Sequence, residues 1–458
     1  MLAGDRPRPV ADVKICVIGA GSAVFSLSLA VDLALTPSLY GSTVSLVDIN
    51  ERRLNAVYSL MRKLFEEVGA RYKLEKTADR RAALRDAGFV INTALAAGHD
   101  RLREGWAVAR ELGYRFGGSL HVMHDEAFWI NFYQFKLFES VIEDVLSICP
   151  DAWYLQLANP VLAGVTLLGR KYPEAKVVGL CHGYRAVYYL ASVLGLDERG
   201  IEFTAPGLNH FIWLTEFKYR GEDAFPILDR WIEEKAEEHW SRCPPSDALG
   251  PKAVDLYRRF GAFPLGDTCT PGGGSWPWWY HVSDEVERRW REDPEGWWRG
   301  YFSWLSKRVE EIFRVAEDPA ARVSERFPLE ASGEQTVPLI ESIACDVPRR
   351  VQVNVMNRGP LVPGIPSSFE VEVPALADGG GVRGLEVRGL PKPVLAYALR
   401  DRVAPVEVEL EAYESGSREL LVELAAMDPW TRSREQAERL VERILKLPYH
   451  EEMRKHYK

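Results

Sequence analysis

Apolar and polar positions along the first 200 residues predict short strands that alternate with helices. Ile15–Ile18 is a run of four β-formers that stops at Gly19, which is typical of a buried parallel strand. Similar short runs lie at 43–48, 72–76, 89–93, 152–157 and 176–180, and helical spacing is found at 51–69, 78–87 and 126–148. This alternation predicts an α/β fold built on a doubly wound parallel sheet.

The first strand runs into a glycine turn, and a helix is expected to begin near Ser22. A strand, a glycine turn and a helix N-terminus form a cradle for a pyrophosphate, because backbone N–H groups and the helix dipole both favour the negative charge. The fingerprint is incomplete, because Val24 occupies its third glycine position. An ordinary strand-to-helix turn is the alternative. The residues expected to bind a dinucleotide here are Gly19, Gly21, Ser22, Ala23 and Val24.

The second and fourth strands each end in a polar residue. Asp48 closes the second strand, 29 residues after Gly19. A carboxylate in this position binds a ribose 2′-hydroxyl and repels a 2′-phosphate, which favours NAD over NADP. Asp48 could instead cap the helix that follows. Asn92 ends the fourth strand at the edge where open α/β sheets bind ligands, so we expect it to contribute to the cofactor site.

Further polar residues are expected at the same edge of the sheet. Asn159 follows the fifth strand, and Cys181 and His182 follow the sixth. Residues 96–126 are polar, rich in glycine and weakly periodic, which predicts a long active-site lid. Cys181 and His210 are a soft and a borderline metal ligand separated by 29 residues. This spacing alone does not distinguish a metal site from the alternative, in which Cys181 is a buried thiol and His210 is a hydrogen-bonded core histidine.

Beyond about residue 200 the pattern changes. Strand-like runs lie at 201–205, 211–219, 350–356 and 368–373, and helices are predicted at 225–240, 246–260, 283–317 and across 394–447. We therefore predict two domains, with an NAD-binding domain at 1–200 and an α+β domain for substrate and oligomerisation at 201–458. The apolar character of the C-terminal helices suggests a homodimer or homotetramer.

Composition narrows the class of protein. The net charge of −9 argues against nucleic-acid binding. The sequence has no run of 18 apolar residues, so no membrane span is expected. The first twelve residues lack an apolar signal region, from which we expect a cytoplasmic protein. Six scattered cysteines in 458 residues do not form a disulfide framework.

Several motifs in order resemble those of glycoside hydrolase family 4, the NAD- and Mn²⁺-dependent glycosidases. The motifs are Gly19–Phe25, Ala158–Val161, Cys181–Gly183, Gly207–His210, Gly266–Thr268, Ser332–Gln335 and Glu372–Leu376. The resemblance covers essentially the whole chain. It implies a Rossmann-like domain of the lactate/malate-dehydrogenase type with a C-terminal α+β substrate domain. It also implies that NAD and Mn²⁺ are the cofactors.

The resemblance also implies roles for individual residues. Cys181 and His210 would bind Mn²⁺, and Asn159 and Asp125 would contact the substrate. NAD⁺ would oxidise C3 of the sugar, a base would remove the C2 proton, the glycosidic oxygen would leave, and water addition and re-reduction would complete the cycle. Asp267 matches the base, although it could be a plain turn residue. Asp125 and His182 are the candidates for the acid, and either could instead be a structural hydrogen-bond partner.

The substrate is less well defined. Cys181-His182-Gly183 resembles the α-glucosidase and α-glucuronidase members, and we see no basic cluster for a 6-phosphate. Relatives commonly carry an arginine after the aspartate, whereas this chain has Thr268 followed by a glycine-rich stretch. We expect an α-glucosidase that acts on a small oligosaccharide or aryl α-glycoside. The alternatives are an α-glucuronidase or α-galactosidase, a 2-hydroxy acid dehydrogenase, and a non-catalytic NAD-binding regulator.

Overall fold

A mixed sheet runs through the molecule. The computed structural model describes residues 11–458, and within them this sheet has twelve strands. Its parallel half has the order β3-β2-β1-β4-β5-β6, which is the order of a doubly wound dinucleotide-binding sheet. These strands are β1 (Lys14–Ile18), β2 (Thr43–Val47), β3 (Lys73–Thr77), β4 (Phe89–Asn92), β5 (Trp153–Gln156) and β6 (Lys176–Gly179). The predicted α/β class is confirmed.

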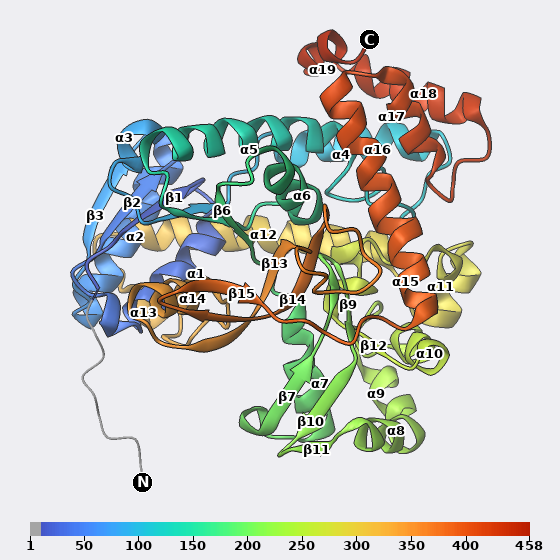
Figure 1. Ribbon diagram of the computed structural model, residues 1–458, viewed down its shortest axis with the longest axis horizontal. Helices are drawn as coiled ribbons and strands as arrows, with labels where there is room; N and C mark the ends of the chain where they lie inside the picture. The colour runs from blue at the N-terminus through green and yellow to red at the C-terminus, as the bar shows by residue number, and fades with distance from the viewer. Residues whose placement is uncertain (1–10) are drawn as a thin grey trace.

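Helices cover both faces of the parallel half. They are α1 (Ala23–Ala34), α2 (Glu51–Val68), α3 (Arg80–Leu84), α4 (Gly98–Glu111), α5 (Phe128–Ile148), α6 (Val161–Lys171) and α7 (Ala186–Leu194). In Figure 1, α5 crosses the top of the sheet and α12 (Pro294–Glu317) runs behind it. The inner strands form because their apolar side chains are buried between these layers: Ile15, Cys16 and Val17 of β1 are fully buried.

The sheet continues beyond β6 with strands from the second half of the chain. β13 (Arg349–Met356) pairs antiparallel with β6, and β14, β8, β9 and β12 follow. The remaining strands are β14 (Glu370–Asp378), β8 (Gly207–Leu208), β9 (Phe211–Leu214), β12 (Phe263–Pro264) and β15 (Gly381–Gly384), with β7 (Ile201–Thr204), β10 (Glu216–Tyr219) and β11 (Glu222–Asp223) in a small separate sheet. Both hydrophobic cores combine residues from before and after residue 200. The predicted division at residue 200 stays a prediction.

Helices make up most of the remainder of the second half. They are α8 (Phe225–Glu234), α9 (Ala236–Arg242), α10 (Pro251–Phe260), α11 (Asp284–Trp290), α13 (Val323–Arg326), α14 (Thr336–Ala344), α15 (Lys392–Ala398), α16 (Ala404–Ser415), α17 (Arg418–Ala426), α18 (Arg434–Leu445) and α19 (Glu451–His456). In Figure 1 the C-terminal helices stand at the upper right and pack beside α4 and α5. The predicted helix at 283–317 is two helices, because Arg291 adopts a left-handed conformation and Asp293 caps a new helix that starts at Pro294.

The stretch at 96–126 differs most from expectation. We predicted a polar lid, but residues 98–111 form helix α4. Leu102, Trp106 and Ala109 are spaced i, i+4 and i+7, and they form a buried face. After α4 the chain passes through the interior, where His121 and His124 are buried. The segment is therefore a helix with one buried face followed by a largely buried turn, and the prediction of an irregular polar lid is wrong.

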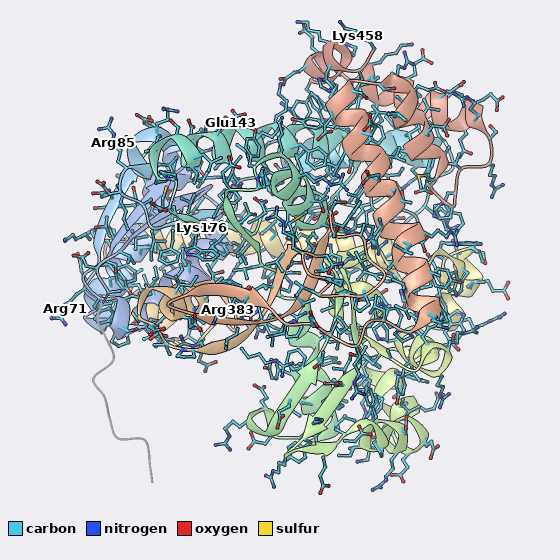
Figure 2. The ribbon with its side chains drawn as sticks, in the orientation of Figure 1. Arg71, Arg85, Glu143, Lys176, Arg383 and Lys458 are labelled. Carbon is cyan, nitrogen blue, oxygen red and sulfur yellow. The ribbon has the colours of Figure 1, made fainter. Side chains whose placement is uncertain are left out.

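Many charged residues lie at the periphery of the molecule. Arg71, Arg85 and Lys458 are exposed, as Figure 2 shows at its outline. Among the described residues, no helix has the length and apolar character needed to cross a membrane. Residues 1–10, which make up most of the segment behind our expectation of a missing signal region, lie outside the described range.

A glycine at the end of β1 is required by close packing. Gly19 has φ +83°, and a Cβ atom there would lie 2.5 Å from the Ala94 backbone. Gly69 at the end of α2 has φ +73° but has no atom within 4 Å of such a Cβ. Gly19→Ala and Gly69→Ala both force alanine to a positive φ, at a cost of roughly 1–2 kcal/mol.

We predict that Gly19→Ala lowers the urea midpoint of unfolding further than Gly69→Ala does. The added clash should cost on the order of 1–3 kcal/mol more. Equal midpoints for the two variants would show that the backbone approach at Gly19 is not tight.

Candidate active site and metal centre

Three residues from distant parts of the chain form a group that could hold a metal ion. Ligand atoms of Cys181, His210 and Asp267 all lie within 4.8 Å of one another. Cys181 follows β6, His210 lies between β8 and β9, and Asp267 lies in a 3₁₀ turn, Gly266–Thr268, after β12. A thiolate, an imidazole and a carboxylate are suitable ligands for a borderline divalent cation. The donor set therefore fits a bound metal.

Glu126 fixes the orientation of the His210 ring through Nδ1, the ring nitrogen that does not face Asp267. Nδ1 of His210 lies 3.1 Å from Oε1 of Glu126, and both side chains are buried. Nε2 faces Oδ2 of Asp267 at 3.9 Å. His210 also has φ +58°, an uncommon left-handed conformation for a residue other than glycine. A carboxyl group on Nδ1 holds the proton there and leaves Nε2 as the free ligand atom.

Burial controls the protonation of the cluster. Burial raises the pKa of the Cys181 thiol above its ordinary value, although the hydrogen bond with His210 opposes this effect. Burial lowers the pKa of His210, but Cys181 and Glu126 outweigh it and raise this pKa well above its usual range. A metal ion requires a thiolate and a neutral imidazole, so metal binding should release protons from this site.

The chain wraps closely around Asp267. Its Oδ1 accepts the Thr270 hydroxyl at 3.1 Å. A Cβ atom on Gly272 would lie 2.7 Å from Oδ1, and one on Gly273 would lie 1.5 Å from the Asp267 carbonyl oxygen. The glycine-rich stretch therefore lets the backbone pass against the carboxylate. Asp267, which we expected as the base, also lies close enough to act as a third metal ligand.

A second polar group adjoins His210. Asp125 Oδ1 lies 3.0 Å from Nδ1 of His124, and the Asn159 amide donates to Asp125 Oδ2 at 3.2 Å. The His124 ring meets the His210 ring edge to face at 6.1 Å. Burial would raise the pKa of Asp125, but the charges of His124 and His210 and the two hydrogen bonds together bring it to about 2. Asp125 is therefore ionised at neutral pH.

The glycine turn at 19–21, which is expected to bind the dinucleotide and is called the dinucleotide turn below, is hydrogen-bonded to the end of the second strand. Asp48 Oδ2 accepts the Gly21 N–H at 2.7 Å, and Oδ1 accepts the Asn50 N–H at 2.7 Å. The cap of α2 is Asn50, which accepts from the Arg53 N–H, so Asp48 does not cap that helix. Ser22 makes no side-chain cap bond at the start of α1. The first N–H groups of a helix have no partner inside it, so those of Ala23 and Val24 suit a phosphate.

Asn92 and His182 lie in different surroundings from the cluster. Asn92 is fully buried: its amide donates to the Tyr154 hydroxyl and its carbonyl accepts the Ala94 N–H. It supports the turn after β4, and its contact with a cofactor stays a prediction. The His182 side chain is 67% exposed. It lines a cavity of about 650 Å³ together with Arg185, Tyr189 and Asp267.

Family models match nearly the whole chain. A model of the family 4 glycosyl hydrolases matches residues 14–195, and a model of the C-terminal domain of that family matches residues 205–431. The chain belongs to glycosyl hydrolase family 4. It is therefore a glycosidase, and the resemblance drawn from the motifs is confirmed.

Named relatives in this family differ in substrate. An α-glucosidase of Erwinia rhapontici is 27% identical over 443 residues, which cover 91% of this chain and 93% of the relative. An α-galactosidase of Bacillus subtilis is 27% identical with the same coverage. An α-galacturonidase of Lachnoclostridium phytofermentans is 25% identical and covers 95% and 96%. These relatives establish a glycosidase and leave the sugar open.

Solved structures share the fold. A 6-phospho-α-glucosidase from gut microorganisms, in complex with NAD and Mn²⁺, has a TM-score of 0.77 at 18% identity and covers 95% of this chain and 98% of its own. A 6-phospho-β-glucosidase of Thermotoga maritima with manganese, NAD⁺ and glucose-6-phosphate scores 0.74 at 18% identity, covering 97% and 99%. A lactate dehydrogenase of Eimeria maxima scores 0.51 at 13% identity, covering 91% and 98%. The dehydrogenase-like fold expected from the sequence is confirmed.

The sequence assigned no role to the buried residues behind this family 4 site, although Asn209 and Glu372 lie in two of the motifs. Glu126 and His124 were part of the supposed lid. Glu370 and Glu372 on β14 are buried behind Asn209, whose backbone N–H donates to Glu370 at 3.3 Å. Burial raises the pKa of Glu372 to about 8, although His210 and hydrogen bonds oppose it. Three adjacent polar residues, His124-Asp125-Glu126, were the sequence signal from which His124 and Glu126 could have been predicted.

We predict that Glu126→Gln weakens Mn²⁺ binding roughly 10–100-fold, because a second partner that orients a metal-binding histidine contributes about that much. Electron paramagnetic resonance of free Mn²⁺ measures the affinity. Glu409→Gln is the matched control, since Glu409 forms an equally buried pair with His121 at 3.2 Å. Unchanged affinity in Glu126→Gln, or an equal loss in both variants, would contradict this role.

Proposed function

We propose that this family 4 enzyme is an NAD⁺- and Mn²⁺-dependent α-glycosidase, and specifically an α-glucosidase. The observation that carries the proposal is the group formed by Cys181, His210 and Asp267, together with its connection to the dinucleotide turn. A metal-free dehydrogenase has no use for such a group. This argues against the 2-hydroxy acid dehydrogenase considered above.

A chain of contacts joins the two parts of the site. Gly19 packs against Ala94. Nε2 of Gln134 on α5 donates to the carbonyl oxygens of Ala94 and Asn159 at 3.2 and 2.9 Å. The Asn159 side chain then donates to Asp125, which lies beside His124 and His210. A sugar between the dinucleotide and the metal ligands would contact both, as the proposed reaction requires.

The two cofactors supply what side chains do not. When bound, NAD⁺ would supply reversible hydride transfer to and from the sugar, and Mn²⁺ would supply Lewis acidity. Gly19, Gly21, Ala23 and Val24 would hold the pyrophosphate, and Asp48 the ribose. Related structures that contain NAD and Mn²⁺ support this assignment.

The side chains of the cluster divide the proton transfers between them. Asp267 would take the C2 proton on Oδ2, because its Oδ1 is held by Thr270. In this role Asp267 would lie beside the ion, and Cys181 and His210 would be the protein ligands that hold it. Asp125 is ionised, so it suits the acceptance of a hydrogen bond from a sugar hydroxyl beside Asn159 better than the donation of a proton. His182, which lines the same cavity as Asp267, would protonate the leaving oxygen. Asp125 could serve as the acid only by passing on a proton taken from His124.

A second candidate activity rests on one residue of the cavity wall. Arg185 lines the cavity with Asp267, and its Nη1 donates to the Ser332 carbonyl. A guanidinium at this place would pair with a carboxylate at C6 of a uronic acid. Relatives named α-galacturonidase agree with this alternative, so an α-uronidase is the second candidate.

A panel of nitrophenyl α-glycosides tests the proposal. We predict turnover of the α-glucoside in the presence of Mn²⁺, NAD⁺ and a reductant, with no effect of Arg185→Met on the KM for this neutral sugar. The galactoside, glucuronide and galacturonide complete the panel. Cleavage of uronides alone, together with a rise in KM in Arg185→Met, would refute the α-glucosidase assignment and favour the uronidase.

A further inference from the structure

We propose that His239, Cys243 and Asp247 form a second metal site, which binds a zinc-class divalent cation. Their ligand atoms lie within 4.8 Å of one another, and all three side chains are half-buried. His239 lies in α9, and Cys243 is the residue directly after its end, four positions further on, where its N–H donates to the His239 carbonyl, so the two lie on the same side of the helix end. Asp247 lies four residues further on, in the loop before α10.

The spacing of two of these groups already matches a metal site. Nε2 of His239 lies 3.4 Å from Oδ1 of Asp247. For bonds of about 2.0–2.1 Å from zinc to nitrogen or oxygen, the edge of a tetrahedron is roughly 3.3–3.4 Å. The Cys243 thiol makes a long contact of 3.9 Å with the Trp240 carbonyl of its own helix. Because this bond is weak, little is lost when the sulfur turns toward an ion.

Neighbouring residues orient the proposed ligands. Asp247 Oδ2 accepts the Tyr189 hydroxyl at 2.9 Å, and Oδ1 accepts the Leu249 N–H at 2.8 Å. The His239 ring packs edge to face on Trp231 of α8 at 5.4 Å. Hydrogen bonds to a ligating carboxylate and packing of the histidine ring are common supports of metal ligands. The side chains of Asp247 and His239 are thus held in place before any ion arrives, and only that of Cys243 has to turn.

The chemistry of the set selects the kind of ion. A thiolate with an imidazole and a carboxylate favours zinc over magnesium or calcium, which prefer oxygen ligands. Thiolate and carboxylate together offset the charge of a dication, and water can take the fourth position. Burial and Asp247 raise the pKa of Cys243, whereas Arg291, which donates to the Cys243 carbonyl at 3.1 Å, lowers it. A bound cation deprotonates a coordinating thiol outright.

The simpler interpretation is a hydrogen-bonded His239–Asp247 pair beside an unrelated cysteine. A hydrogen bond between His239 and Asp247 is not strengthened by the Cys243 thiol beside it, so this interpretation does not explain why the thiol lies within ligand distance of both. A metal ion would join α9 to the loop before α10 and, through Tyr189, to α7. Tyr189 and Ala248 also line the cavity that reaches Asp267, so the ion would stiffen one wall of the substrate cavity. The site is therefore structural and separate from Cys181, His210 and Asp267.

Metal counting on the full-length enzyme tests the proposal. Protein stripped by a chelator is dialysed against Zn²⁺, and bound zinc is counted by mass spectrometry. We expect two equivalents in the wild type, one in Cys243→Ser and one in Cys181→Ser. Cys345→Ser, at a buried thiol elsewhere, should retain two. Equal zinc content in Cys243→Ser and the wild type would overturn the proposal, whereas an unchanged Cys181→Ser would instead contradict the active-site metal.

A spectroscopic test identifies the sulfur ligand directly. In the Cys181→Ser background, Co²⁺ should still give the near-ultraviolet sulfur-to-cobalt band, and the added Cys243→Ser should remove it. Asp247→Asn keeps the shape of the side chain and should weaken Co²⁺ binding. This variant therefore tests the second site if Cys243→Ser does not fold. Absence of the band in Cys181→Ser, or its persistence in the double variant, would overturn the second site.

Discussion

The carboxyl ends of the parallel strands meet at one edge of the sheet, and the rest of the site depends on this constraint. Gly19 follows β1, the residues after β4 contact it, Asn159 follows β5 and Cys181 follows β6. Antiparallel strands added beside β6 then bring His210 and Asp267 to the same place from the second half of the chain. Groups far apart in sequence are positioned by strand pairing, which is rigid because the strands are buried on both faces.

Burial determines the protonation and the ligand properties of the side chains at this edge of the sheet. Water is excluded around Glu126, His210 and Glu372, so each charge needs a partner, and protons are redistributed between neighbours. A cysteine, a histidine and an aspartate in such surroundings are poor general acids but good ligands. A divalent cation compensates these buried charges, since it stabilises the Cys181 thiolate and binds the neutral imidazole of His210. Glu126 keeps the imidazole proton on Nδ1, away from the ion.

The sequence predicted the local parts of this arrangement and missed the parts that depend on the path of the chain. Strands β1 and β4 are continuous apolar runs, and the turn at Gly19 has a recognisable pattern, so both could be predicted. Cys181 and His210 could be chosen only through their resemblance to a family, because their spacing is uninformative. The lid prediction failed because helix α4 has a narrow apolar face inside a polar stretch. Glu126 was missed because its pairing with His210 spans 84 positions and leaves no local signal.

The central claim is that the glycosidic bond is broken by elimination after oxidation at C3, with a proton removed from C2. Hydrolysis of nitrophenyl α-glucoside in D₂O, with NAD⁺ and Mn²⁺ present, tests it most directly through the isotope at C2 of the released glucose. The account predicts deuterium at C2 in the product, and none at C2 in glucose that is kept in the same D₂O buffer without the enzyme. Product that keeps its original hydrogen at C2 would contradict the account and indicate direct displacement at the anomeric carbon.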